Sequence, residues 1–198
     1  AGLEDAGFGE TLLSSLFQSV TTRTAGFNTI PQADLSPPSK LITILLMFTG
    51  EAPGSIAGGI KVTTVFLILA LAVKGTDEQG AMRLGSREVP RRVFTKVSTF
   101  VIKAGLLCLT CFAALILVES LLQPGRFSFL AMLFETVSAF ATVGLSEGIT
   151  FDFSWLGKLV LIATMFTGRV GIVMMAMPKP QRYIERFEDF PAEDVLIG

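Results

Sequence analysis

Apolar positions fall into helix-length stretches that alternate with polar segments containing glycine. Between Phe8 and Val20 the apolar residues recur on one helical face, which predicts a helix of about 12 residues and about 18 Å, roughly half a bilayer core. Leu41 to Val73 is a second apolar stretch, and as a single helix it would run about 50 Å. That length exceeds what a bilayer core needs, so a break is expected within it.

Residues 50–61 supply that break, because they hold four glycines, a proline and two charged residues. A continuous lipid-facing helix would not tolerate this composition. We therefore expect two half-helices, at about 41–50 and 61–73, joined by an irregular loop at membrane depth. Such a loop is viable only where it lines water or packs against protein, so it is a candidate gate.

The second half of the chain predicts three further apolar helices. Residues 93–119 have the length of a full membrane span, interrupted only by Lys103. Residues 127–139 form a second half-membrane helix, and residues 153–177 a second full span.

A repeat relates the two halves. Thr24-Ala25-Gly26-Phe27 recurs 118 residues later as Thr142-Val143-Gly144-Leu145, and Met47-Phe48-Thr49-Gly50 recurs at the same offset as Met165-Phe166-Thr167-Gly168. The repeated unit is a short helix, a polar loop with glycine, and a long apolar segment.

Charge is distributed unevenly between the connections. The connection 74–96 holds six basic residues, whereas Arg126 is the only basic residue of 120–153. By the positive-inside rule, the linker 74–92 is expected in the cytoplasm, together with the tail 178–198.

Composition supports lipid as the solvent, because 51% of residues are apolar, 17% are charged and the mean hydropathy is +0.62. The absence of histidine excludes Ser-His and Cys-His catalysis, and no carboxylate pair stands at helical spacing in the membrane, so an enzyme is not expected. A net charge of −1 argues against a nucleic-acid partner. Cys108 and Cys111 are interpreted as small buried side chains rather than a redox or zinc pair.

The two half-membrane helices at 8–20 and 127–139 are each expected to end at a Thr-x-Gly loop near the bilayer middle. A helix C-terminus favours a cation, and successive inward carbonyls need positive φ, which is the role expected for Gly26 and Gly144. Rings of carbonyls replace the hydration shell of potassium, so the hypothesis is a carbonyl-lined cation filter.

These motifs resemble those of the Trk/Ktr/HKT superfamily of potassium transporters, and most of all the bacterial Ktr membrane subunit. The resemblance rests on the two Thr-x-Gly segments, on Pro53-Gly54-Ser55 with Ala57-Gly58-Gly59-Ile60-Lys61, and on Phe166-Thr167-Gly168-Arg169. It extends over nearly all of the chain.

The resemblance implies an all-α integral membrane fold, potassium-channel-like, with four repeats of membrane helix, re-entrant pore helix with filter loop, and second membrane helix. About one and a half repeats are present here. Residues 1–73 match the third repeat without its first helix, and residues 93–177 match the fourth. The chain is either a fragment or needs an N-terminal half supplied separately.

The resemblance also implies roles for individual residues. Filter contacts to potassium, mostly through backbone carbonyls, fall on Thr24, Ala25, Gly26, Phe27, Thr142, Val143, Gly144 and Leu145. The gate falls on Gly50, Glu51, Gly54, Ser55, Gly58, Gly59, Lys61 and Arg169. Glu51 departs from the small residue expected there, and it can pair with Arg169 or Lys61, or bind a passing cation.

Other interpretations of these residues stay open. Gly58 and Gly59 can serve close helix packing, and Arg169 can be a structural ion-pair partner. We expect Glu135 to support the filter, and Arg23 to brace the first filter loop with its guanidinium rather than repel cations.

The function implied is potassium uptake across the cell membrane by a multi-pass pore subunit with a cytoplasmic C-terminus. The implied partners are a second pore subunit and a cytosolic ring of regulatory subunits that bind a nucleotide, docked near 74–92 and the tail; no organic cofactor is expected in this chain. An ion-coupled secondary transporter with discontinuous helices is the alternative. The scarcity of buried acidic residues, with only Glu51 and Glu135 in the spanning parts, weakens it.

Overall fold

The computed structural model describes residues 7–52, 58–75, 82–84 and 87–171. Their α-helices are α1 (Phe8–Thr21), α2 (Pro37–Phe48), α3 (Val62–Lys74), α4 (Arg91–Leu122), α5 (Phe129–Phe140) and α6 (Trp155–Phe166). Short 3₁₀ turns are η2 (Gln32–Asp34) and η3 (Ile149–Asp152), a π-helix is η4 (Thr167–Gly171), and the strands are β1 (Met82–Leu84) and β2 (Arg87–Val89).

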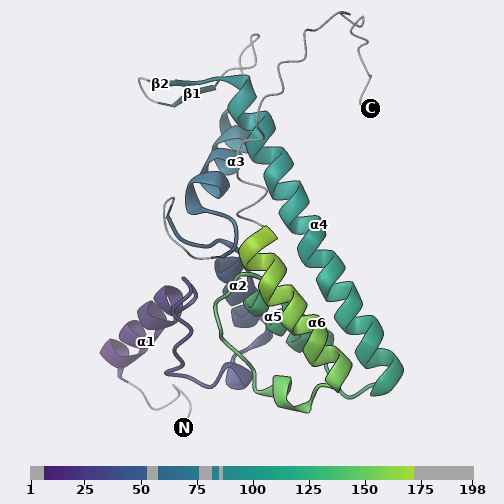
Figure 1. Ribbon diagram of the computed structural model, residues 1–198. Coiled ribbons are helices and arrows are strands. Elements are labelled where there is room, and N and C mark those ends of the chain that lie inside the picture. The colour runs from purple at the N-terminus through teal and green to yellow at the C-terminus, as the bar shows by residue number, and fades with distance from the viewer. Residues whose placement is uncertain (1–6, 53–57, 76–81, 85–86, 172–198) are drawn as a thin grey trace, which may run out of the picture.

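Helix α4 is the longest element, and the other helices of the second half lie along it (Figure 1). Its 32 residues extend about 48 Å, and within the described ranges it alone is long and apolar enough to cross a bilayer. The shorter apolar helices α2, α3 and α5 have 12 or 13 residues, about half a bilayer core.

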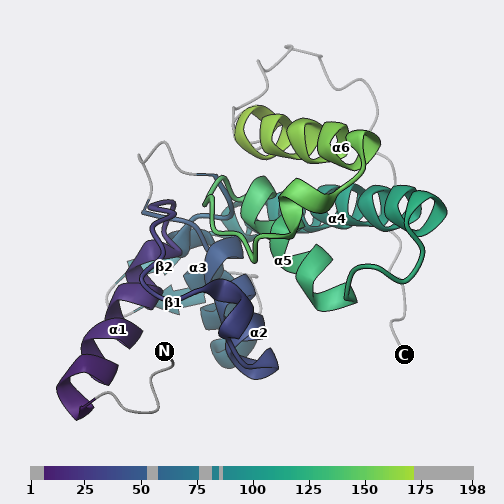
Figure 2. The same ribbon diagram turned by 90° about the horizontal axis from the view of Figure 1, so that it is seen from below.

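Helix α5 lies at the centre, in contact with α2, α4 and α6 (Figure 2). Phe134 and Phe140 are completely buried, and the Phe140 ring stacks on Phe48 of α2 with centroids 6.4 Å apart. Almost every residue of α5 from Ala131 onward is buried. Helix α5 is thus enclosed by the protein over most of its length.

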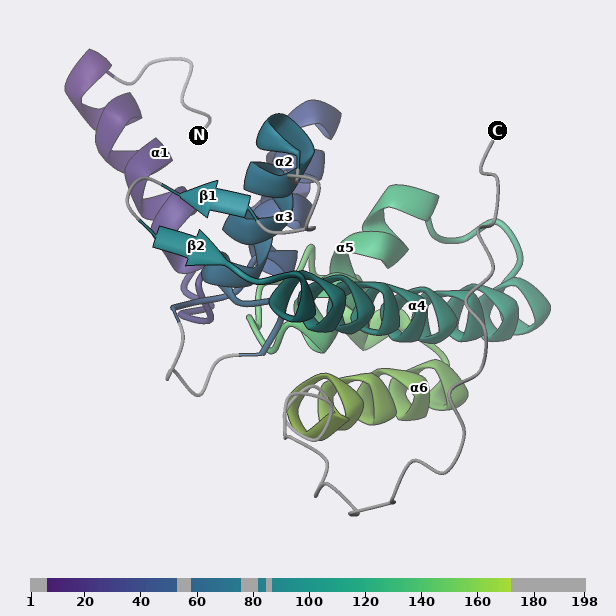
Figure 3. The same ribbon diagram turned by 90° about the horizontal axis from the view of Figure 1, so that it is seen from above.

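Helix α1 lies apart from α4 and α6 in all three views (Figures 1 to 3). Its apolar face is open, since Leu12, Leu13, Leu16 and Val20 are each more than half exposed. In this respect it differs from α5, its counterpart in the repeat.

The repeat of the sequence is visible in α2 and α6, which begin and end 118 residues apart. The hydroxyl of Ser36 accepts the Ser39 N–H, and that of Ser154 accepts the Gly157 N–H, so both helices have the same N-cap. Because Pro37 and Pro38 are compatible with a first helical turn, α2 starts earlier than the predicted residue 41.

The second full span expected from the sequence differs in the structure. The span expected over 153–177 is α-helical only to Phe166 and continues as the π-helix η4; residues beyond 171 lie outside the described part. The backbone of Gly168 packs so closely on Phe140 that an added Cβ would overlap the Phe140 carbonyl oxygen. This contact places the change of helix type at the second Thr-Gly, where α2 also ends.

The all-α expectation also missed a small antiparallel hairpin in the linker 74–92 (Figure 3). Strand β1 pairs with β2 so that Met82 faces Val89, and Met82 is buried. The charge pattern used for this linker carries no information on strand pairing. The tail 178–198 lies outside the described residues.

Candidate functional site

The two Thr-x-Gly loops lie against each other, although 118 residues separate them. Helix α1 ends at Thr21 and α5 at Phe140, and each leads into its loop. A Cβ added to Gly144 would lie 4.0 Å from the Gly26 Cα, and one added to Gly26 would overlap the Val143 carbonyl oxygen. The fold therefore brings together the residues predicted as filters.

Backbone angles alternate along both loops. Gly26 and Gly144 have φ values of 70° and 90°, which confirms the positive φ expected at the two glycines. Thr24 and Thr142 also have positive φ, 66° and 56°, which residue type did not indicate because β-branched residues rarely adopt it. The two loops thus share one unusual conformation at matching positions.

Most carbonyl oxygens of these loops accept no hydrogen bond within the described part of the chain, although that of Val143 packs against Gly26. Phe27 is an exception, because its carbonyl accepts the Thr21 hydroxyl at 2.6 Å. The remaining predicted filter carbonyls accept no hydrogen bond from another described residue: Thr24, Ala25, Gly26, Thr142, Val143, Gly144 and Leu145. With the negative ends of α1 and α5 behind them, such carbonyls suit a dehydrated monovalent cation.

Part of the predicted gate, namely Gly50, Glu51, Gly58 and Gly59, lies in two facing backbone segments beside the second filter loop. We refer to these two segments, 49–51 and 58–60, as the neck. The Gly50 N–H donates to the Ile60 carbonyl (2.8 Å), and the Ile60 N–H donates to the Phe48 carbonyl (3.0 Å), so hydrogen bonds join the two segments. Gly58 N–H donates to the Thr142 hydroxyl at 3.1 Å. Gly54 and Ser55, also predicted for the gate, lie outside the described residues.

Arg23 braces the neck rather than its own loop. Its Nη1 donates to the Thr49 carbonyl and, at 3.0 Å, to the Gly50 carbonyl. A guanidinium has several donors in a fixed plane, so it can hold two neighbouring carbonyls. The bracing role was expected, but the sequence did not indicate this target.

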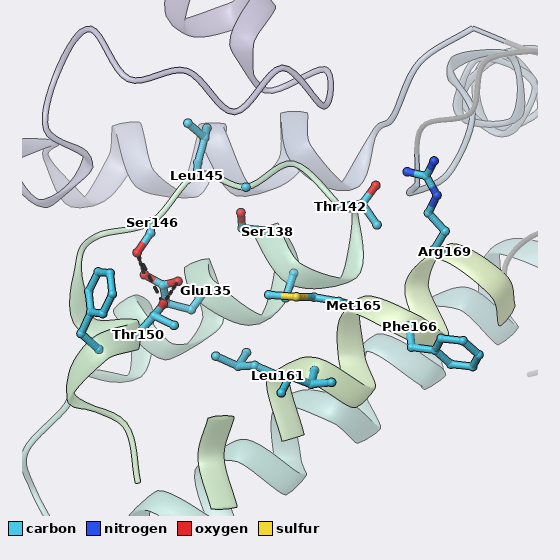
Figure 4. A pocket seen from close by; sticks show the side chains of 14 residues that line it. Glu135, Ser138, Thr142, Leu145, Ser146, Thr150, Leu161, Met165, Phe166 and Arg169 are labelled. Carbon is cyan, nitrogen blue, oxygen red and sulfur yellow. Dashed lines mark hydrogen bonds between the residues drawn. The ribbon is translucent and has the colours of Figure 1, made fainter. Parts of the chain in front are cut away.

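Arg169 lies on η4 and lines a cavity of about 710 Å³ together with Thr142 and Phe166 (Figure 4). It is exposed and forms no ion pair with any described residue, so the pairing with Glu51 is not formed here. Glu51 lies near Lys61 instead, since its carbonyl accepts the N–H of the neighbouring Val62 at 3.2 Å.

Glu135 lies at the opposite end of this cavity and supports the segment after the second filter loop (Figure 4). Its carboxylate accepts the Ser146 hydroxyl (2.7 Å), the Glu147 N–H (2.8 Å) and the Thr150 hydroxyl (2.7 Å). Lys40 of α2 forms an ion pair with Glu147 at 2.7 Å, which ties the two repeats together. No local spacing signals this pair, because 107 residues separate its members.

Glu119 is a buried carboxylate that the sequence analysis did not count. It is 1% exposed, and its Oε1 accepts the backbone N–H and the hydroxyl of Ser154 at 3.0 and 2.7 Å. Among the described residues of the spanning parts, the buried acidic side chains are thus Glu119 and Glu135, whereas Glu51 is only partly buried. Glu119 holds the N-terminus of α6.

Comparison with known proteins places the chain in a family. The family model TrkH, described as a cation transport protein, matches residues 3–180. The Ktr system potassium uptake protein D of Bacillus subtilis is 36% identical over 94% of this chain and 40% of its own length. The Ktr system potassium uptake protein B of Vibrio alginolyticus is 34% identical over 94% of this chain and 39% of its own length.

A further relative, the potassium/sodium uptake protein NtpJ of Enterococcus hirae, is 33% identical over 96% of this chain and 42% of its own length. The chain thus spans about two fifths of these relatives. All three relatives are named as transport proteins rather than enzymes. With the family model matching most of its residues, this chain belongs to the TrkH family of cation transport proteins.

Proposed function

We propose that the chain is the C-terminal half of a Ktr/Trk-type pore subunit that takes up potassium across the cell membrane. The observation that carries this proposal is the contact between two loops of like conformation, with positive φ at matching positions and carbonyls that mostly accept no hydrogen bond from another described residue. The names of the relatives support potassium as the transported ion. The filter carbonyls would be those of Thr24 to Phe27 and Thr142 to Leu145, with Phe27 already engaged by Thr21.

Open apolar faces support the proposal that this is half of a fourfold pore. Within the chain, α2 packs on α5, and its Ile44 and Met47 are 7% and 0% exposed. Their counterparts on α6, Ile162 and Met165, are 59% and 47% exposed and line the cavity. Repeating the α2–α5 contact would place another pore helix there, supplied by an N-terminal half.

The gate is proposed for the region 50–61 and Arg169. The neck lies directly on the second filter loop, and Arg169 shares the cavity with Thr142. A positive charge at this place would oppose the passage of cations. Potassium flux through the complete subunit should therefore rise in the variant Arg169→Ala, and an equal or lower flux would contradict the gate.

The subunit assembly that we propose is the one implied by the resemblance to the Trk/Ktr/HKT superfamily. We propose a homodimer of pore subunits in the cell membrane, with a cytosolic ring of regulatory subunits on the linker 74–92 and the C-terminal tail. The regulatory nucleotide would bind to the ring, and this chain would hold potassium ions without an organic cofactor.

The test is uptake of rubidium or potassium by uptake-deficient cells that express the complete subunit, with and without Gly26→Ser together with Gly144→Ser. We expect the paired substitution to abolish uptake or to admit sodium. Uptake untouched by it would refute the filter. A flux that saturates with rising ion concentration, as that of a carrier does, would favour the secondary transporter. The buried Glu119 does not favour it, because its carboxylate accepts hydrogen bonds from Ser154, the N-cap residue of α6.

A further inference from the structure

We propose that Arg23 and the Thr142 hydroxyl are positioning residues for ion selectivity, because they fasten both filter loops to the neck. This inference rests on the proposed filter. It concerns the way in which the carbonyls of two separate loops are kept at one spacing.

Backbone hydrogen bonds and close contacts hold the two segments of the neck together. Hydrogen bonds from Gly50 to Ile60 and from Ile60 to Phe48 join its two segments. An added Cβ on Gly50 would overlap the Gly58 carbonyl oxygen, so the segments are in direct contact. Carbonyls held in this way cannot move independently of one another.

The first filter loop reaches the neck through Arg23, which directly precedes Thr24. Charge-assisted hydrogen bonds to Thr49 O and Gly50 O are stronger than neutral ones, and the planar guanidinium fixes their direction. The matching position in the second repeat is Ala141, which is completely buried. A Cβ added to Gly58 would lie only 2.7 Å from the Ala141 carbonyl oxygen, so this side touches the neck without a long side chain.

The second filter loop reaches the neck through the Thr142 hydroxyl, which accepts the Gly58 N–H. Its counterpart, the Thr24 hydroxyl, is buried and has no hydrogen-bond partner among the described residues. The two filter threonines thus share backbone conformation and differ in this one contact. This difference provides a matched comparison within the chain.

The experiment measures the potassium-over-sodium permeability ratio of the complete subunit with Arg23→Gln, Arg23→Lys, Thr142→Val, Thr142→Ser and Thr24→Val. We expect Arg23→Gln to lower the ratio about tenfold, the size that fits the loss of a charge-assisted hydrogen bond. Arg23→Lys keeps the charge without the planar guanidinium, so its ratio should lie between those of Arg23→Gln and the unsubstituted protein. Thr142→Val should lower the ratio more than Thr24→Val, and Thr142→Ser, which keeps the hydroxyl, should stay near the unsubstituted protein.

Surface level and the thermal unfolding midpoint of each variant serve as readouts of folding. A merely structural role would lower these without changing the ratio. Ratios within twofold of the unsubstituted protein for both Arg23→Gln and Thr142→Val would overturn the inference. If Arg23→Gln fails to reach the membrane, Arg23→Lys and the threonine comparison still decide. An unsubstituted subunit without selectivity would instead refute the proposed function itself.

Discussion

At the scale of single residues, the two filter glycines share positive φ and differ in their surroundings. A side chain at Gly26 would overlap the Val143 carbonyl oxygen of the other loop. At Gly144 the nearest atom to an added Cβ is the Gly26 Cα, 4.0 Å away. Gly26 is therefore required for both conformation and space, whereas Gly144 is required for conformation.

This difference predicts an order of effects. Gly144→Ala should cost about 1–2 kcal/mol in backbone strain and lower the potassium-over-sodium ratio of the complete subunit moderately. Gly26→Ala should lower the ratio more, because its methyl group also displaces a carbonyl of the second loop. Permeability ratios of the two variants, compared at equal surface level, check this order. Equal ratios would contradict the contact between the loops.

At the scale of elements, α2 and α6 are corresponding helices of the repeat, and they differ in the contacts of their N-cap serines. Ser36 accepts an N–H and is exposed. Ser154 accepts the Gly157 N–H and also donates its hydroxyl to the buried Glu119 carboxylate at 2.7 Å. The start of α6 is therefore tied to the end of α4, whereas Ser36 has no such carboxylate partner among the described residues.

Ser154→Ala should accordingly destabilise the protein more than Ser36→Ala. Loss of an N-cap costs about 1 kcal/mol, and loss of a hydrogen bond to a charged group adds about 1.5–3 kcal/mol. Thermal unfolding in detergent measures both variants under the same conditions. Similar midpoints would indicate that Glu119 finds another donor when the serine is absent.

At the scale of the whole molecule, the apolar face of α2 packs on α5 of the other repeat, whereas the corresponding apolar residues of α6 are exposed. The contact of α2 with α5 is apolar, with the Lys40–Glu147 ion pair beside it. On α6 the corresponding apolar residues are exposed and border the cavity. If the chain is half of a fourfold pore, as proposed above, further units would cover this exposed face.

Two matched substitutions test this. Ile162 on the open face of α6 and Leu109 on α4 are 59% and 60% exposed. We expect Ile162→Asn to reduce co-purification of an N-terminal half by about tenfold, the effect of about 1.4 kcal/mol, because an amide side chain would replace an apolar contact. Leu109→Asn should leave co-purification unchanged if α4 faces lipid. Equal behaviour of the two variants would contradict assembly on α6.

Local patterns were sufficient for much of the fold. Helix-length apolar stretches and the positions of proline and glycine are local features of the sequence. They predicted the short helices, the positive φ of the two glycines and a break over 50–61, and α2 ends close to that break, at Phe48. Residue type did not indicate positive φ at Thr24 and Thr142, because their conformation is held by the surrounding loops rather than by an intrinsic preference.

Tertiary structure alone decided which distant groups meet. Three contacts join residues at least 26 positions apart: Arg23 with the Thr49 carbonyl, Lys40 with Glu147, and the Ser154 hydroxyl with Glu119. The close approach of Gly168 to Phe140 is likewise a contact between distant residues, and it lies within the π-helix η4. Hydrogen bonds and ion pairs need atoms within about 3 Å, and across such separations only the packed chain brings them that close.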